Sequence, residues 1–136
     1  MKIAAINPNS TVSMTEKAAV AARVVEPLAD IRAVTCHGAP PAIQRPQDGA
    51  LALPFLLAAV QQAALDGADA AIIACFDDTG LAEARAAVKI PVLGIGEAAF
   101  HAAMLLGHRY CVVTTLSVSL PVIAANLRAY GLASHC

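Results

Sequence analysis

The chain has 136 residues, of which 58% are hydrophobic and only 14% are charged. This composition excludes a disordered chain and is typical of one domain whose elements are buried on more than one side. Nine Lys and Arg stand against ten Asp and Glu, for a net charge of -1. Because the chain has no basic stripe and no acidic tail, its charge pattern gives no support to binding of nucleic acid or of a membrane surface.

The N-terminus and the cysteines favour a cytoplasmic protein. The opening MKIAAINPNS has too short an apolar run for a signal peptide, and the longest apolar run, 51–60, contains Pro54. We therefore expect no membrane-spanning segment. The four cysteines lie far apart without a C-x-x-C pair, which favours free thiols over a disulfide framework.

Segments typical of strands and of helices alternate along the chain. Short apolar runs predict strands at 2–6, 31–36, 69–76, 90–96 and 109–116. Helical periodicity, caps and stop signals predict helices at 11–25, 51–66, 80–88, 97–107 and 119–131. The Pro/Gly-rich loop at 37–49 is a candidate for a mobile lid. This alternation predicts an α/β fold, in which a parallel sheet carries helices on both faces.

Polar or thiol-containing segments follow four of the predicted strands. They are NPNS (7–10), CFDDTG (75–80), GIGE (94–97) and VTTLS (113–117). In parallel α/β sheets, ligands bind in the crevice at the carboxyl ends of the strands. We therefore expect these four segments to share one crevice.

Cys75 stands where the third predicted strand opens into a polar turn and a helix. A thiol near a helix N-terminus has a lowered pKa and is available as thiolate, so Cys75 is a candidate catalytic residue. The alternative is a small buried core residue, which is what we expect of Cys36 and Cys111. For Asp77 and Asp78 the alternative to a functional role is that of turn and N-cap residues before the helix.

Two other kinds of site have weak support. Four scattered histidines form no pair at ligand spacing, so the sequence predicts no metal site. The segment GIGEAA (94–99) loosely matches a dinucleotide-binding fingerprint, but it follows the fourth strand and no acidic residue stands about 20 positions further on. We expect Gly94 and Gly96 instead to let the backbone approach a small ligand, with the amides of the helix N-terminus facing an anion.

Taken together, INPNS, ACFDDTGL, PVLGIGEAAFHAA and VVTTL resemble, in order and spacing, the aspartate/glutamate/hydantoin racemase superfamily. CFDDTGL is most similar to its hydantoin and allantoin racemase branch. The resemblance implies a racemase that needs no cofactor and inverts the carbon next to a carbonyl, with two cysteines acting on opposite faces of the substrate. It implies that Cys75 is the first of these cysteines. It further implies a substrate pocket lined by Asn7, Asn9, Ser10, Phe76, Asp77, Thr114 and Thr115.

The resemblance also implies a fold of two pseudo-symmetric α/β lobes, well beyond one small domain. We expect residues 1–108 to form the first lobe and residues 109–136 to form the first strand and helix of an incomplete second lobe. The second cysteine, in a Gly-Cys motif, would then lie beyond Cys136, so that the 136-residue chain alone is inactive. We also expect a homo-oligomer that binds a small-molecule substrate, either a 5-substituted hydantoin or allantoin. The alternatives are an Asp/Glu racemase, a non-catalytic small-molecule-binding remnant, and a nucleotide-binding module built on GIGEAA.

Overall fold

A parallel sheet organises the larger part of the molecule, whose computed structural model describes all 136 residues. Its four strands are β1 (Lys2–Asn7), β2 (Asp30–Thr35), β3 (Ala70–Ile73) and β4 (Val92–Gly94), in the order β2-β1-β3-β4. β1 lies between β2 and β3, and Ile6 pairs with Val34 on one side and with Ile73 on the other. The predicted α/β fold is confirmed.

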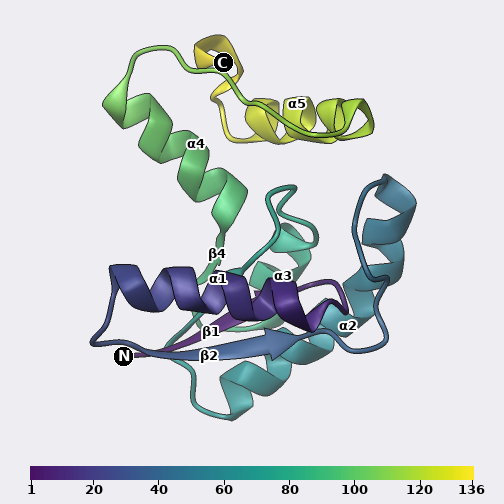
Figure 1. Cartoon of the computed structure of the whole chain (residues 1–136), viewed down its shortest axis with the longest axis vertical. Helices are drawn as coiled ribbons and strands as arrows, with labels where there is room; N and C mark the ends of the chain where they lie inside the picture. The colour runs from purple at the N-terminus through teal and green to yellow at the C-terminus, as the bar shows by residue number, and fades with distance from the viewer.

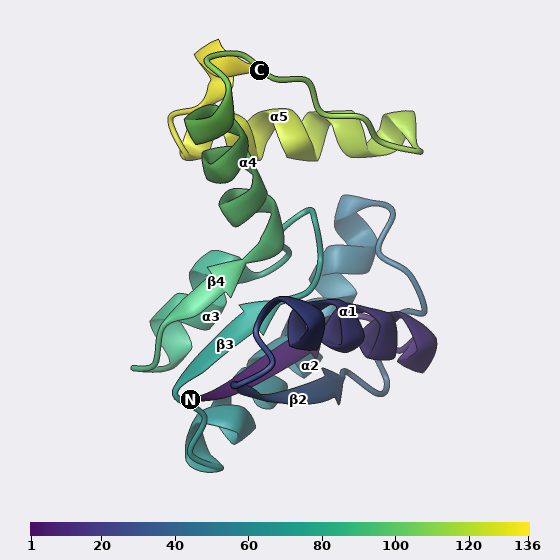
Figure 2. The same cartoon turned by 60° about the vertical axis from the view of Figure 1, so that its left-hand side comes forward.

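Helices cover both faces of this sheet. The five α-helices of the chain are α1 (Val12–Val25), α2 (Pro46–Leu65), α3 (Leu81–Ala87), α4 (Ile95–Leu106) and α5 (Leu120–Ala129). α1 lies on one face of the sheet, and α2 and α3 lie on the other (Figure 1). α4 leads away from the end of β4, and α5 lies beyond it, away from the sheet (Figure 2).

The main core lies between the sheet and the helices α2 and α3. Alternate residues of the strands, among them Ala4, Ile6 and Ile73, face Leu56 and Val60 of α2 in one cluster of 13 buried residues. This alternation follows from the strand period of two, which sends successive side chains to opposite faces.

α2 is long and apolar enough to cross a membrane, judged by its length and composition only. We expected no membrane-spanning segment, and this helix passes the test of length because it begins five residues earlier than the predicted one and continues through Pro54. Its buried residues Ala52, Leu56, Val60 and Ala63 belong to the main core. Core helices of globular proteins pass the same test, so the finding is weak support for a membrane span.

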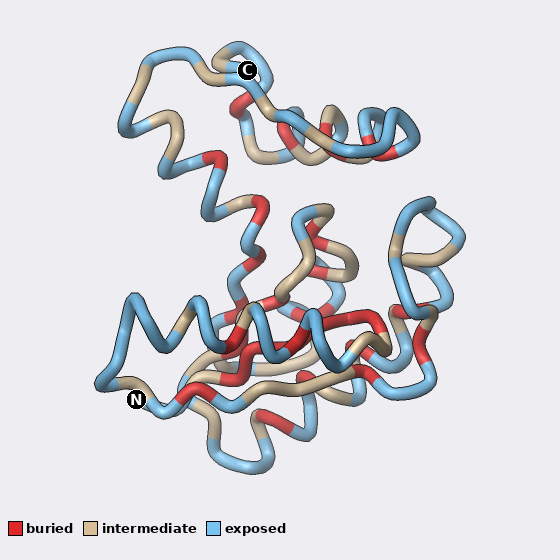
Figure 3. Tube along the Cα trace, viewed as in Figure 1, coloured by how far each residue is buried: buried red, intermediate tan, exposed pale blue.

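A second, smaller core joins α4 to the C-terminal part of the chain. It consists of Phe100, Ile123, Leu127 and Leu132, with Met104 and Tyr110 among the half-buried residues that pack against it. Figure 3 shows the buried residues concentrated around the sheet, with few of them in α4 and α5. Because α4 contributes Phe100, the second core begins before the domain boundary that we expect at 108.

The prediction of a fifth strand at 109–116 is wrong. The segment runs as extended chain without strand pairing. The amide of Tyr110 donates a hydrogen bond to the carbonyl of His135 over 3.0 Å, and the carbonyl of Leu116 accepts one from the amide of Ser119 over 3.1 Å. A β-strand needs a neighbour whose amides and carbonyls complete its ladder. This segment lies beside α5, away from both edges of the sheet (Figures 1 and 2), so no such neighbour is within reach.

The loop that we considered a mobile lid is shorter than predicted and is tied to the N-terminus of α1. α2 begins at Pro46, within the predicted loop. The amide of Ser10 donates a hydrogen bond to the carbonyl of Pro40 over 3.1 Å, and the Thr11 hydroxyl donates one to the carbonyl of Pro41 over 2.6 Å. These bonds hold the loop over the carboxyl end of β1.

Candidate active site

A cavity of about 440 Å³ opens at the carboxyl ends of β1 and β3. Its wall comes from Asn9, Met14, residues 42–44, residues 74–77, Ile95 and three residues of the segment 115–119. Small-molecule sites have volumes of this order, with a mostly apolar lining and a few polar groups. The crevice that we expected at the strand ends is therefore present.

Five of the residues that the resemblance assigned to the site share this cavity: Asn9, Cys75, Phe76, Asp77 and Thr115. The other three, Asn7, Ser10 and Thr114, do not line it. The backbone amide of Ser10 donates a hydrogen bond to the loop, at the carbonyl of Pro40. Asn7 is fully buried beneath Asn9.

Asn7 acts on the cavity through Asn9. Its Nδ2 donates hydrogen bonds to Asn9 Oδ1, 2.8 Å away, and to Thr15 Oγ1, 3.1 Å away. Asn9 Oδ1 also accepts a hydrogen bond from the amide of Thr11 at 2.9 Å, whereas its Nδ2 meets only the sulfur of Met14 at 3.8 Å. The side chain of Asn9 is therefore held in place, and its amide remains available as a donor to a ligand in the cavity.

The thiol of Cys75 is half-buried in the cavity wall, with its Sγ 3.7 Å from Thr79 Oγ1. Burial raises the pKa of the Cys75 thiol above its ordinary value, and this outweighs the hydrogen bonds from Thr79 and from the amide of Asp77, which lower it. The expectation of a lowered pKa is wrong, because α3 begins only at Leu81 and its N-terminus does not compensate for the lost hydration. The raised pKa favours the protonated thiol of Cys75 over the thiolate.

The other cysteines do not line the cavity. Cys36 is buried in the main core, as expected, and Cys136 is exposed. Cys111 is also exposed, so the expectation that a strand would shield it is wrong. The reason is the missing strand pairing at 109–116, which leaves this segment on the surface.

The N-terminus of α4 is occupied by a carboxylate of the protein itself. The amides of Gly96 and Glu97 donate to Asp78 Oδ1 and Oδ2, over 2.9 Å and 2.6 Å. A Cβ at Gly94 or Gly96 would collide with this carboxylate. The glycines of GIGE thus make room for Asp78, so the prediction that they admit a ligand anion is wrong, and the dinucleotide-binding alternative loses its basis. Asp78 is also no N-cap of α3, where that position is taken by Gly80.

Asn126 of α5 and Tyr130, which caps the C-terminus of α5, contact the loop that follows Cys75. Neither residue was identified from the sequence. Asn126 Nδ2 donates to the carbonyl of Asp77 at 2.8 Å, and the Tyr130 hydroxyl donates to Asp78 Oδ2 at 2.9 Å. These partners are 49 and 52 positions apart in the chain. No local pattern signals such pairs, because they depend on how α5 folds back toward the sheet.

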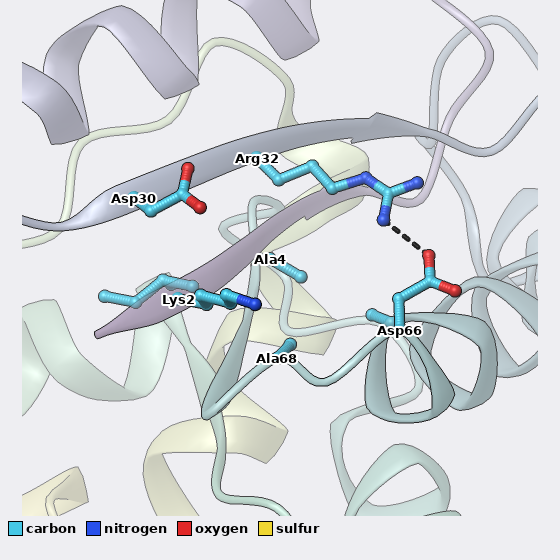
Figure 4. A pocket seen from close by; sticks show the side chains of 8 residues that line it. Lys2, Ala4, Asp30, Arg32, Asp66 and Ala68 are labelled. Atoms are coloured by element: carbon cyan, nitrogen blue, oxygen red, sulfur yellow. Dashed lines mark hydrogen bonds and ion pairs between the residues drawn. The ribbon is translucent and has the colours of Figure 1, made fainter.

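A second, smaller hollow lies at the opposite end of the sheet (Figure 4). It has a volume of about 190 Å³ and is lined by Lys2, Asp30, Arg32 and Asp66 among others. Arg32 and Asp66 form an ion pair with 2.5 Å between Nη1 and Oδ2, so their charges compensate each other. No group of three or more His, Cys, Asp or Glu side chains is placed to hold a metal ion.

Comparison with known proteins identifies the family. The family model described as Asp/Glu/Hydantoin racemase matches residues 3–136. A hydantoin racemase from Rhizobium meliloti is 42% identical over 137 residues, which cover 100% of this chain and 57% of that protein. A hydantoin racemase from Pseudomonas sp. (strain NS671) is 34% identical, over 97% of this chain and 53% of its own.

Solved structures give the same result. An allantoin racemase from Klebsiella pneumoniae superimposes with a TM-score of 0.97 at 38% identity, covering 100% of this chain and 56% of that one. An allantoin racemase from Pseudomonas fluorescens gives 0.89 at 34% identity, with 58% of that chain covered. The chain thus spans somewhat more than half the length of the relatives that it matches. The resemblance of the sequence motifs is confirmed, and the chain belongs to the Asp/Glu/hydantoin racemase family.

Proposed function

We propose that the chain supplies one half of the active site of a cofactor-independent racemase. The substrate is a 5-substituted hydantoin or allantoin, inverted at the carbon next to its carbonyl. The observation that carries this proposal is the thiol of Cys75 in the wall of a cavity of about 440 Å³ at the strand ends. The names of the relatives, hydantoin racemase and allantoin racemase, support the substrate class.

The chemistry of inversion suits such a thiol. Racemisation at a carbon next to a carbonyl needs a base on one face of the substrate and an acid on the other. With its raised pKa, Cys75 is the acid in one direction of the reaction, and as thiolate it is the base in the other. The enolate formed between the two steps needs hydrogen-bond donors, for which Asn9 Nδ2 and the Thr115 hydroxyl lie in the same cavity wall.

The second proton-transfer group is proposed to be a cysteine outside these 136 residues. Cys75 is the one thiol that lines the cavity, because Cys36 is buried in the main core and the other two cysteines lie elsewhere on the surface. On this proposal, residues 1–108 are one lobe, 109–136 belong to a second lobe, and the enzyme works in the cytoplasm as a homo-oligomer. The 136 residues alone would then racemise hydantoins negligibly.

A chimera tests the proposal. These 136 residues replace the matched part of the Rhizobium meliloti hydantoin racemase, and polarimetry follows the loss of optical rotation of an L-5-substituted hydantoin. We expect racemisation by the chimera but not by the 136 residues alone. Cys75→Ser should slow the chimera by roughly 10² to 10⁴, the usual effect of losing a positioned acid or base.

Cys111→Ser is the matched control, because it removes an exposed thiol that does not line the cavity. It should leave the rate unchanged. Racemisation that survives Cys75→Ser would refute the role of this thiol. Racemisation of aspartate or glutamate in place of the hydantoin would show that the substrate class is wrong.

A further inference from the structure

From a buried position, Asp78 joins its own loop to α4 and to the C-terminal end of α5. Asp78 is 6% exposed, and its carboxylate accepts hydrogen bonds from the amides of Gly96 and Glu97 and from the Tyr130 hydroxyl. Its backbone adopts φ 49°, the left-handed region that non-glycine residues rarely use. A residue persists in such a strained conformation when its surroundings hold it in place. Here three hydrogen-bond donors hold one buried carboxylate.

The two residues before Asp78 also contact α4 and α5. The ring of Phe76 meets that of Phe100 edge to face, with centroids 5.2 Å apart. The carbonyl of Asp77 accepts the hydrogen bond from Asn126. Three successive residues after Cys75 are thus bound to α4 and α5.

The same contacts connect two walls of the cavity. Cys75, Phe76 and Asp77 form one wall, and Thr115 and Leu116, which precede α5, form part of another. Asp78 does not line the cavity itself, so it acts on the site through its neighbours.

We propose that Asp78 is a positioning residue for Cys75: its carboxylate binds both α4 and Tyr130 at the C-terminus of α5, and thereby sets the position of the thiol relative to the 115–119 wall. The inference rests on the proposed function, since it concerns the thiol to which that function assigns proton transfer. Glu97, Arg85 and Asp77 are the charged groups near Asp78. Asp77 is also the charged group near Cys75.

The reactivity of the thiol tests this role without any turnover. In the 136-residue protein, alkylation of each cysteine by iodoacetamide is followed by mass spectrometry over about pH 6.5 to 10, a range that spans the titration of a thiol. The variants are Asp78→Asn and Tyr130→Phe, and exposed Cys111 is the internal reference. Tyr110→Phe is the matched control, because the Tyr110 hydroxyl lies in the same aromatic cluster and makes no hydrogen bond.

Release of the loop should hydrate the thiol and lower its pKa, so that Cys75 reacts faster at neutral pH. We expect about a tenfold gain with Asp78→Asn and roughly threefold with Tyr130→Phe, each with the pH profile moved to lower pH. Tyr110→Phe should leave Cys75 at its original rate, and the rate at Cys111 should be the same in all three variants. If Asp78→Asn fails to fold, Tyr130→Phe decides alone, because it leaves the bonds from Asp78 to α4 intact.

A lower melting temperature with an unchanged Cys75 profile would overturn the proposal and leave Asp78 as a helix cap only. An equal effect of Tyr110→Phe and Tyr130→Phe would overturn it too, since general loosening of the aromatic cluster would then be the cause. An inactive chimera together with shifted Cys75 profiles would defeat the proposed function while supporting the role of Asp78. An active chimera with unshifted Cys75 profiles would support the proposed function and overturn the role of Asp78.

Discussion

The two cores of this molecule differ in how they are held. The main core has 13 buried residues between a hydrogen-bonded sheet and two helices. The second core has four, and its extended segment 109–116 pairs with no strand. Large apolar side chains remain exposed there, including Leu106 and Val113, each at 91%. The first region can keep its shape through its own contacts, whereas the second depends on the first through Phe76, Asp77 and Asp78.

This contrast predicts very different effects of one substitution made in each core. Leu56→Ala, at a fully buried position of α2, should lower the free energy of unfolding by about 2–5 kcal/mol. Leu127→Ala in α5 should cost at most about 2 kcal/mol, because its cluster is small and peripheral. Urea unfolding followed by circular dichroism measures both. Equal losses would show that the two cores unfold as one unit.

A buried cysteine of the main core, Cys36, should make the free energy of unfolding fall at alkaline pH. Burial raises the pKa of Cys36 to about 11 from an ordinary value of 9.0. Because the folded pKa lies above the unfolded one, its contribution to stability is complete below about pH 9 and is lost as the pH rises through 11. The loss should be roughly 2–3 kcal/mol by the linkage of pKa to stability.

Urea unfolding at several pH values, compared between the wild type and Cys36→Ala, isolates this effect. Cys36→Ala should flatten the alkaline fall in stability, whereas Cys111→Ala, which removes an exposed thiol, should not. An identical fall in the wild type and in Cys36→Ala would assign it to other groups.

The four cysteines should be alkylated at rates that follow their exposure in the two regions. Near neutral pH, iodoacetamide should modify the exposed Cys111 and Cys136 first, Cys75 next and the buried Cys36 last. We expect Cys75 to react more slowly than Cys111, since burial raises the pKa of the Cys75 thiol and limits the access of the reagent. The sequence instead predicts a lowered pKa for Cys75 and a buried Cys111, which would give the opposite order. Modification of Cys75 before Cys111 would contradict the burial of Cys75 in this structure.

The exposed apolar surface of the second region should cause self-association. Leu105 and Leu106 at the end of α4 are 80% and 91% exposed, and burying such residues between copies is favourable. The double substitution Leu105→Glu and Leu106→Glu should weaken association about fivefold, or ~1 kcal/mol. Sedimentation velocity measures this, with Leu28→Glu as control, at an equally exposed position of the first region. A protein that is monomeric before any substitution would contradict the prediction.

Local pattern determined much of the fold. Apolar runs of strand length, alternating with helical periods, were enough to place β1 to β4 and all five helices to within a few residues, apart from the start of α2. The position of Cys75 beside a crevice also followed from local sequence, since the carboxyl ends of parallel strands meet at one edge of the sheet. These features depend on neighbours in the chain, which a sequence displays directly.

Tertiary structure alone decided the rest. The segment 109–116 has a strand-like composition, yet it forms no strand, because a strand also needs a paired edge. The pKa of Cys75 rises although a helix follows it, because burial by distant residues outweighs the nearby amides. The roles of Gly94 and Gly96 became clear only once Asp78 lay against them. Its partner Tyr130 lies 52 positions away in the sequence, and only the folded chain brings the two together.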